Sequence, residues 1–269
     1  MTVSQNIVYG LKIHGESHHA AMGKAERVMK LVGLEKLGHR SPAHLSGGQQ
    51  QRVSLARSLI MEPKVLLFDE PLSNLDAKLR EAMRMEIRKL QQRVGITSIY
   101  VTHDQLEAMS LSDRIVILKD GRIQQIGAPH DIYSRPNSCF VADFIGKANF
   151  MKVFVEKVIS DKEVVIDLLG KKFVIPEVNT TFKEDEKAIL VLRPESIGLE
   201  KKKVDTISGT IQEIVYLGSQ VTYMVDIAGQ TITVDVSNPQ EYESFQKDEE
   251  VSIKLPRKSL HLLPWEEEQ

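Results

Sequence analysis

The sequence predicts an α/β domain followed by a small all-β domain. In the first half, apolar strand patterns at residues 65–68 and 97–102 flank a helical pattern at 77–94, and such alternation is typical of α/β folds. From about Asn149 the helical patterns give way to short segments of period-two alternation separated by Gly, Asn and Pro. We therefore predict a domain boundary after residue 148.

Within residues 1–148 we expect a helical part at 1–60 and a part at 61–148 that carries the parallel strands. The remaining residues, 149–269, are expected to form a small OB-like β-barrel. The length of 269 residues agrees with about two domains.

The bulk composition points to an ordinary folded protein. A formal net charge of −2 gives no global sign of a nucleic-acid or anionic-membrane partner. The single cysteine, Cys139, has no partner for an internal disulfide, which suits a reducing cytoplasm. No apolar run approaches the ~18 residues that span a bilayer, and we expect no secretory signal.

The first part of the chain is predicted to be helical. Val3, Ile7 and Leu11 follow the spacing of a short amphipathic helix, and a second helix is expected at about 19–31. Gly33 stands where that second helix should end.

Ser46-Gly47-Gly48-Gln49 immediately precedes an amphipathic run at residues 50–61. A Ser-Gly-Gly opening allows backbone N–H groups to approach an anion, towards which the positive end of the helix dipole points. Ser46 is also a good N-cap. The plainer alternative is an ordinary capped helix with a glycine turn in front of it.

Asp69 and Glu70 end the apolar run at residues 65–68, which we expect to be a central parallel strand buried on both faces. Ligands of open α/β sheets bind at the carboxyl ends of strands. Asp69 is therefore a candidate Mg²⁺ ligand, and Glu70 is a candidate general base for an attacking water. Two solvated acids at a strand end are the alternative.

The turn Ser73-Asn74-Leu75-Asp76 follows, and Asp76 is expected to cap the helix at 77–94. His103 lies at the carboxyl end of the strand at 97–102, so we expect it at the same sheet edge as the two acids. A lone histidine is more often structural than catalytic, and its position at the strand end favours the catalytic reading.

A phosphate-binding loop of the form G-x-x-x-x-G-K-[ST] is not found in these residues. Each Gly-Lys pair lacks the hydroxyl residue and the preceding glycine that this loop requires. The pairs and the residues that follow them are Gly23-Lys24 with Ala25, Gly146-Lys147 with Ala148, and Gly170-Lys171 with Lys172.

The motifs together resemble those of ATP-binding cassette (ABC) transporter ATPases of the importer type. In chain order they are Leu45-Ser46-Gly47-Gly48-Gln49-Gln50-Gln51-Arg52, Asp69-Glu70, Ser73-Asn74-Leu75-Asp76 and His103. The resemblance implies a partial P-loop NTPase cassette, comprising the helical subdomain and the second half of the parallel sheet.

The same resemblance implies a role for each motif. The signature, Ser46 to Gln49, would close over the γ-phosphate of ATP held by a facing subunit. Asp69 would bind Mg²⁺, Glu70 would be the catalytic glutamate, and His103 would be the switch histidine that contacts the γ-phosphate. The turn at residues 73–76 would be the D-loop, which crosses the dimer interface.

Two segments of the second part resemble the TOBE domain, an OB-like barrel at the C-terminus of many importer ATPases. They are Leu192-Arg193-Pro194-Glu195-Ser196-Ile197 and the stretch from Gly209 to Gly218. OB folds also bind nucleic acid, but the segment lacks a basic groove with interleaved aromatic residues, so we do not expect that activity.

The resemblance implies an ATP-binding subunit that couples ATP and Mg²⁺ to solute uptake at the cytoplasmic face of the cell membrane. Its expected partners are membrane-embedded permease subunits, a second ATPase subunit in a homo- or heterodimer and, indirectly, an extracytoplasmic solute-binding protein. Residues 140–150 resemble the iron(III), phosphonate and polyamine importer group.

Two alternatives stay open at this stage. Without a phosphate-binding loop the chain looks like an importer ATPase with its first part removed, so it could be a hydrolysis-incompetent partner of a complete cassette, with negligible activity alone. A soluble ABC-type ATPase acting on ribosomes or DNA is less favoured, because the chain has one signature and no sustained heptads.

Overall fold

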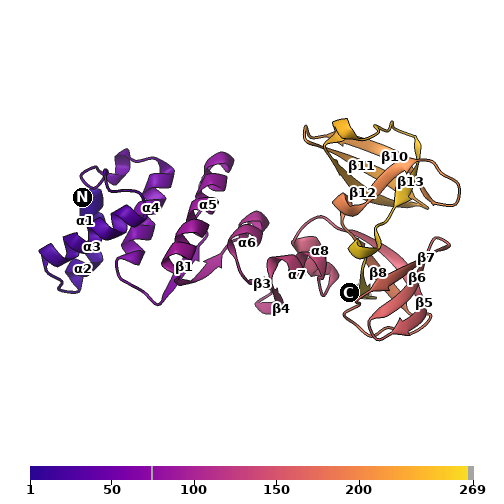
Figure 1. The fold of residues 1–269 in the computed structure, drawn as a ribbon, viewed down its shortest axis with the longest axis horizontal. Coiled ribbons are helices and arrows are strands. Elements are labelled where there is room, and N and C mark those ends of the chain that lie inside the picture. Colours follow the sequence, from indigo (N-terminus) through magenta and orange to yellow (C-terminus); the bar gives the residue numbers. More distant parts are fainter. Residues whose placement is uncertain (74, 266–269) are drawn as a thin grey trace. The chain divides into compact units, whose positions relative to one another are not determined.

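A computed structural model describes residues 1–73 and 75–265, so the predicted D-loop residue Asn74 lies outside the described residues. The chain divides into two compact units, Met1–Asp113 and Arg114–Gln269 (Figure 1). The domain boundary predicted after residue 148 falls inside the second unit and stays a prediction. The predicted order, α/β first and antiparallel β second, is confirmed.

The first unit begins with helices packed around one apolar cluster. Val3, Ile7 and Leu11 are all buried there, as their spacing predicts, although Val8 separates two short helices where one was expected. The helices are α1 (Val3–Ile7), α2 (Tyr9–Ile13), α3 (His18–Leu31), the 3-10 turn η1 (Pro42–His44) and α4 (Gly47–Leu59).

A parallel pair of strands follows, flanked by two helices. Strand β1 pairs with β2 in a register that runs from Val65 opposite Thr97 to Asp69 opposite Val101. The elements are β1 (Val65–Asp69), α5 (Ala77–Val94), β2 (Thr97–Val101) and α6 (Gln105–Leu111).

The expectation that β1 is buried on both faces is wrong. Leu66 is buried and packs with the helical cluster, whereas the side chain of Leu67, on the other face, is 71% exposed. Ile99 and Val101 of β2 share that exposed face. The helices of the described chain cover only one side of this two-stranded sheet. Because successive side chains of a strand point to opposite faces, one apolar residue is buried and the next is exposed.

The second unit opens with a β-hairpin. The Asp-Gly pair in Lys119-Asp120-Gly121 predicts a hairpin from the sequence, and the structure confirms it. Asp120 and Gly121 have φ angles of 52° and 73°, as a two-residue turn with left-handed residues requires. Its strands are β3 (Ile115–Lys119) and β4 (Arg122–Gly127), and the helices α7 (Pro129–Ser134) and α8 (Cys139–Phe144) follow.

Two antiparallel five-stranded sheets make up the rest of this unit, in the orders β12-β11-β10-β13-β9 and β14-β8-β5-β6-β7. Their inward side chains form one apolar core. Eight of the strands lie where alternation predicts them, whereas β9 and β14 were not predicted. The strands are β5 (Asn149–Ser160), β6 (Glu163–Leu168), β7 (Lys171–Pro176), β8 (Lys187–Leu192), β9 (Gly198–Lys201), β10 (Ile207–Tyr216), β11 (Gln220–Ile227), β12 (Gln230–Ser237), β13 (Glu250–Lys254) and β14 (His261–Pro264), with short 3-10 turns η2 (Pro194–Ser196), η3 (Pro239–Glu241) and η4 (Arg257–Ser259).

Arg193 joins α7 and α8 to this core. Its guanidinium is buried and lies 4.1 Å from the centre of the Tyr133 ring. It donates hydrogen bonds to the backbone carbonyls of Tyr133, Ala142, Gly146 and Lys147 at 2.8–3.3 Å. Burial lowers the pKa of Arg193 from its ordinary value.

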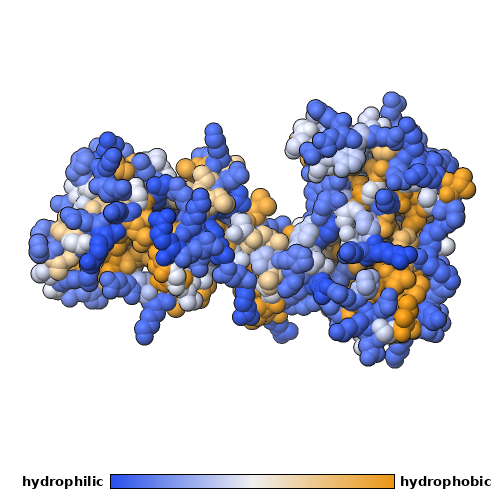
Figure 2. All heavy atoms as spheres, in the orientation of Figure 1, coloured by the Kyte–Doolittle hydropathy of each residue, from blue (hydrophilic) through white to orange (hydrophobic). Residues whose placement is uncertain are grey.

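The surface is largely hydrophilic, with apolar side chains between the charged ones on both units (Figure 2). In the described part of the chain, no helix combines the length and apolarity that crossing a membrane requires.

Candidate functional site

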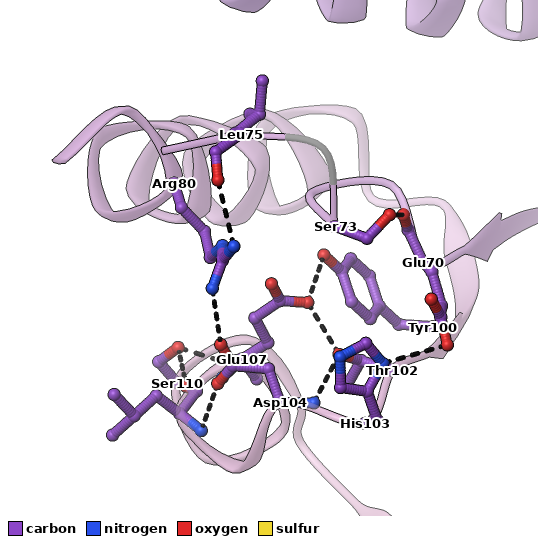
Figure 3. Close-up of polar contacts among 11 residues, drawn as sticks. Glu70, Ser73, Leu75, Arg80, Tyr100, Thr102, His103, Asp104, Glu107 and Ser110 are labelled. Atoms are coloured by element: carbon purple, nitrogen blue, oxygen red, sulfur yellow. Dashed lines mark hydrogen bonds and ion pairs between the residues drawn. The ribbon is translucent and has the colours of Figure 1, made fainter. Parts of the chain in front are cut away.

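Glu70 and His103 lie together where the two parallel strands end (Figure 3). The N–H of Glu70 donates to the carbonyl of Val101 at 2.9 Å, which extends the pairing of β1 with β2 by one residue. Beyond this point Oε1 of Glu70 lies 3.0 Å from Nδ1 of His103. The sequence places both residues at one sheet edge, and the structure brings their side chains into contact.

Both side chains are open to solvent, with relative exposures of 46% for Glu70 and 74% for His103. The hydrogen bond from Glu70, and then its negative charge, raise the pKa of His103 above the ordinary value. With Nδ1 facing the carboxylate, the Nε2 atom of the ring is left for another group, and it is a donor when the ring is protonated.

The backbone at Glu70 is in the left-handed region, with φ at 42°. Non-glycine residues seldom adopt this conformation, and such outliers concentrate at functional sites. The chain turns here: the hydroxyl of Ser73 donates to the carbonyl of Glu70 at 3.0 Å, and the side chain of Leu72 is fully buried. The strand end is thus anchored on both sides of the exposed carboxylate.

Ser46 caps α4, as predicted, through a capping box with Gln49. The Ser46 hydroxyl accepts from the backbone N–H of Gln49 at 3.4 Å, and the Gln49 side chain accepts from the N–H of Ser46 at 3.0 Å. Only a residue without a side chain fits closely here, because a Cβ at Gly47 or Gly48 would lie 3.1–3.3 Å from side chains of α5 or the turn before it. The glycines therefore allow close packing of α4.

The turn after β1 contacts both α4 and α5. Leu75 is the side chain nearest to a Cβ built at Gly47. Asp76 caps α5, as predicted, by accepting from the N–H of Leu79 at 2.9 Å. Within the described residues, no hydrogen bond or ion pair links the Ser46–Gln49 segment to Glu70 or His103, so the structure forms two separate groups of candidate residues.

A buried carboxylate behind His103 was missed from the sequence. Glu107 is only 3% exposed, and its Oε2 accepts hydrogen bonds from the hydroxyls of Tyr100 at 3.0 Å and Thr102 at 2.8 Å. Burial, followed by the charge of Glu107, raises the pKa of Tyr100. The available signal is the spacing Asp104-x-x-Glu107 at a helix start, which by itself predicts acids in a first helical turn and no buried carboxylate.

Asp69, at the end of β1, is exposed. Among the described residues no three His, Cys, Asp or Glu side chains are grouped as a metal site. Mg²⁺ that accompanies a nucleotide is typically held by one or two carboxylates together with phosphate oxygens. A single exposed carboxylate beside Glu70 fits that kind of donor set.

The geometry therefore defines an α/β protein with acid and histidine side chains at the carboxyl ends of adjacent parallel strands. Comparison with protein families agrees: the ABC transporter family matches residues 1–73, and the TOBE domain family matches residues 190–263.

Individual relatives extend along almost the whole chain. An Fe(3+) ions import ATP-binding protein of Brucella melitensis is 44% identical over 98% of this chain and 73% of that protein. One of Rhizobium etli with the same description is 48% identical over 84% of this chain and 63% of that protein. A spermidine/putrescine import ATP-binding protein of Mesoplasma florum is 40% identical over 99% and 73%, respectively. The chain belongs to the ATP-binding proteins of ABC importers.

Proposed function

We propose that this chain binds ATP with Mg²⁺ and that its Glu70–His103 pair takes part in ATP hydrolysis coupled to solute import. The contact between these two side chains, at the carboxyl ends of paired parallel strands, is the observation that carries the proposal. Asp69 would hold Mg²⁺, which neutralises phosphate charge when bound. Glu70 would accept a proton from the attacking water.

His103 has a separate task in this proposal. Because Glu70 raises its pKa, the imidazole is more often protonated near neutral pH than a free histidine is. A protonated ring that is held at Nδ1 presents Nε2–H as a donor to a negatively charged phosphate oxygen. Glu70 therefore both orients the histidine and favours its charged form.

We propose that Ser46, Gly47, Gly48 and Gln49 contact nucleotide held by a second ATPase subunit, while Ser73, Leu75 and Asp76 contribute to the interface between the two. The phosphate cradle of this composite site would be that of the second subunit. A nucleotide beside Glu70 and His103 needs a cradle of its own, and these 269 residues contain no G-x-x-x-x-G-K-[ST] sequence. Membrane-embedded permease subunits, and indirectly an extracytoplasmic solute-binding protein, would complete the importer at the cytoplasmic face of the membrane.

The proposed solute is Fe³⁺, supported by the names of relatives at 44% and 48% identity, with polyamines as the second candidate from a relative at 40% identity. Uptake of radiolabelled iron and of labelled spermidine into vesicles that contain the assembled importer separates the two. Uptake of spermidine without iron would overturn the iron assignment.

Substitution of Glu70 by Gln tests the hydrolytic role in the assembled complex with its permease and a complete cassette subunit. The amide keeps the size of the side chain but cannot accept a proton, so turnover at the site that contains Glu70 should fall by about 10²-fold or more. Binding of a labelled ATP analogue should persist.

The matched control is Glu81→Gln, at an exposed position of α5. It removes the same charge and should leave turnover unchanged. Full turnover in the Glu70→Gln complex would exclude Glu70 as the base. The isolated chain should show no Mg²⁺-dependent turnover, and a complete cassette whose activity and ATP affinity are unaffected by adding this chain would count against the composite site.

A further inference from the structure

Arg80, in the first turn of α5, reaches two segments that the proposed function uses (Figure 3). Its Nη2 donates to the carbonyl of Leu75 at 3.0 Å, in the turn after β1. Its Nη1 lies 3.5 Å from Oδ2 of Asp104, the residue after His103. One guanidinium therefore bridges the turn that follows Glu70 and the segment that carries the histidine.

The two oxygens of Asp104 divide their contacts. Oδ2 faces Arg80, whereas Oδ1 accepts from the N–H groups of Leu106 at 2.8 Å and Glu107 at 3.2 Å and so caps α6. The Asp104 N–H donates to the hydroxyl oxygen of Thr102 at 2.9 Å. A displacement of Asp104 would consequently disturb both the start of α6 and Thr102.

Thr102 is anchored from behind by the buried carboxylate of Glu107, to which its hydroxyl donates. His103 thus lies between two residues with fixed side chains, while its own ring is exposed. On the other side of the bridge, Leu75 immediately precedes Asp76, the cap of α5. The backbone on both sides of the Glu70–His103 pair is held by polar contacts that meet at Arg80.

We propose that Arg80 is a positioning residue that couples the D-loop turn at residues 73–76 to the His103 segment at 102–104. This proposal deepens the proposed function and rests on it. Arg80 contacts neither Glu70 nor His103 and acts through the two backbones that carry them. A change at the turn, such as the approach of a second subunit, would then alter the placement of His103.

The chemistry of this position favours arginine. A guanidinium offers donors in two directions from a rigid plane, which a carbonyl and a carboxylate on different segments require. The Nε of Arg80 is buried and has no hydrogen-bond partner within the described residues, a cost that a flexible side chain could avoid. Lysine carries the charge but cannot hold both acceptors in a fixed plane.

A second arginine of the same helix provides a matched control. Arg88 of α5 also bridges a backbone carbonyl and an aspartate, donating to Leu111 O at 2.9 Å and Asp113 Oδ1 at 2.6 Å, and it donates to Gln91 Oε1 at 3.1 Å as well. Substitution of either arginine by Gln therefore removes similar contacts from the same helix. The contacts of Arg80 lie near the Glu70–His103 pair, and those of Arg88 lie away from it. General loosening of α5 would appear in both variants.

Hydrogen exchange of the full chain without nucleotide tests the coupling directly. In Arg80→Gln, exchange should accelerate by about tenfold at both the Leu79 and the Leu106 amides, since each depends on an aspartate cap next to a bridged segment. Arg88→Gln should leave these two amides unchanged, and Arg80→Lys should be intermediate. Acceleration at only one amide, at neither, or equally in Arg88→Gln would overturn the coupling.

Turnover of the assembled complex gives the second readout. Arg80→Gln should lower kcat by about tenfold with less than a twofold change in the KM for ATP, because the placement of the pair changes and nucleotide contacts do not. Arg88→Gln should retain the parental kcat, and a kcat unchanged in Arg80→Gln would refute the positioning role. Full activity of Glu70→Gln would instead refute the proposed function. The coupling would then be tested by the hydrogen-exchange result alone.

Discussion

At the scale of single residues, Glu70 has the largest influence on the charge of His103, and the charges of Glu107 and Asp104 add to it. The ring is largely exposed, and its Nδ1 faces Glu70. This makes the histidine a sensitive reporter of whether the two strand ends keep their relative position.

The titration of His103 should therefore respond to Glu70. Glu70→Gln removes the carboxylate that raises the pKa, so the pKa of His103 should move down towards 6.5. Since the folded value is the higher one, the contact stabilises the folded chain fully below the ordinary pKa and is lost as pH rises through the raised pKa. Titration by ¹H–¹⁵N NMR measures this shift.

Glu86→Gln provides the comparison for this titration, because Glu86 pairs with Arg52 and not with a histidine. The pKa of His103 should be unchanged there. An equal shift in both variants would attribute the effect to net charge and not to the contact.

Predictions for single residues were correct where the role of a residue follows from its position next to a helix in the sequence. Ser46 and Asp76 precede helical patterns, and both are caps in the structure. Arg80 and Glu107 were missed as parts of a network. The ion pair between Arg80 and Asp104 depends on the packing of α5 against the start of α6, which no local pattern encodes. The partners of Glu107 are only five and seven residues away, but an acid in a first helical turn does not by itself indicate that its side chain is buried against them.

At the scale of elements, helix starts and turns follow from chemistry that is visible in the sequence. The Asp-Gly turn predicts the β3–β4 hairpin, and alternation in the sequence predicts a strand at Glu163–Leu168, which is where β6 lies. Burial is harder to predict: the apolar run of β1 reads as a strand covered on both faces, but coverage depends on what packs against each face. The strands β9 and β14 were missed because short strands show too few alternations.

The capping box at α4 should contribute measurably to stability. Ser46→Ala removes the hydroxyl that accepts from the Gln49 N–H, so the free energy of unfolding should fall by about 1 kcal/mol. Ser46→Asn, which also caps helices well, should retain most of the stability. Urea denaturation followed by circular dichroism measures both, and equal loss in the two variants would contradict the capping role.

Gly23 in α3 offers a change of opposite sign. A Cβ at this exposed helical position would meet no atom within 4 Å. Gly23→Ala should therefore stabilise the first unit by about 0.5–1 kcal/mol through a lower entropy of the unfolded chain.

Gly209→Ala should do the reverse in the second unit. A Cβ there would lie 2.6 Å from the Val225 side chain and 2.9 Å from the Asp226 carbonyl, so neighbouring strands would have to move. Thermal unfolding compares the two variants. Destabilisation by Gly23→Ala would show that the helix is constrained in a way that its open surroundings do not indicate.

At the scale of the whole molecule, the two compact units have separate apolar cores. The first unit has one cluster among helices α1 to α4 and a smaller one between α5, α6 and the turn after β1. The core of the second unit lies between its two five-stranded sheets. The composition shift near Asn149 predicts where the β-rich part starts. It does not predict that α7 and α8 are tied to that part, because the tie is made by long-range contacts, among them the hydrogen bonds of Arg193 and the packing of Ala142 against Val191 and Leu263.

Loss of that guanidinium should destabilise the second unit in particular. Arg193→Met keeps an unbranched stem but removes the guanidinium and leaves four backbone carbonyls without this donor, so the free energy of unfolding should fall by about 3 kcal/mol or more. Hydrogen exchange should accelerate in the strands of this unit and not in α1 to α4. The exposed Arg122→Met is the control, and equal effects would contradict the role of Arg193.

Some contacts of the second unit can form only after residues near the end of the chain have been synthesised. Nε2 of His261 bonds to the carbonyl of Pro136, a residue 125 positions earlier, and Asn149 bonds to Thr233 across 84 positions. At about 5–20 residues per second, a ribosome would need roughly 6–25 s to supply the later partner of Pro136. Through that interval the edge of β8 that β14 later covers stays unpaired, because β14 is the last strand of its sheet to be made. This half of the molecule is therefore the part that nascent-chain chaperones have reason to protect.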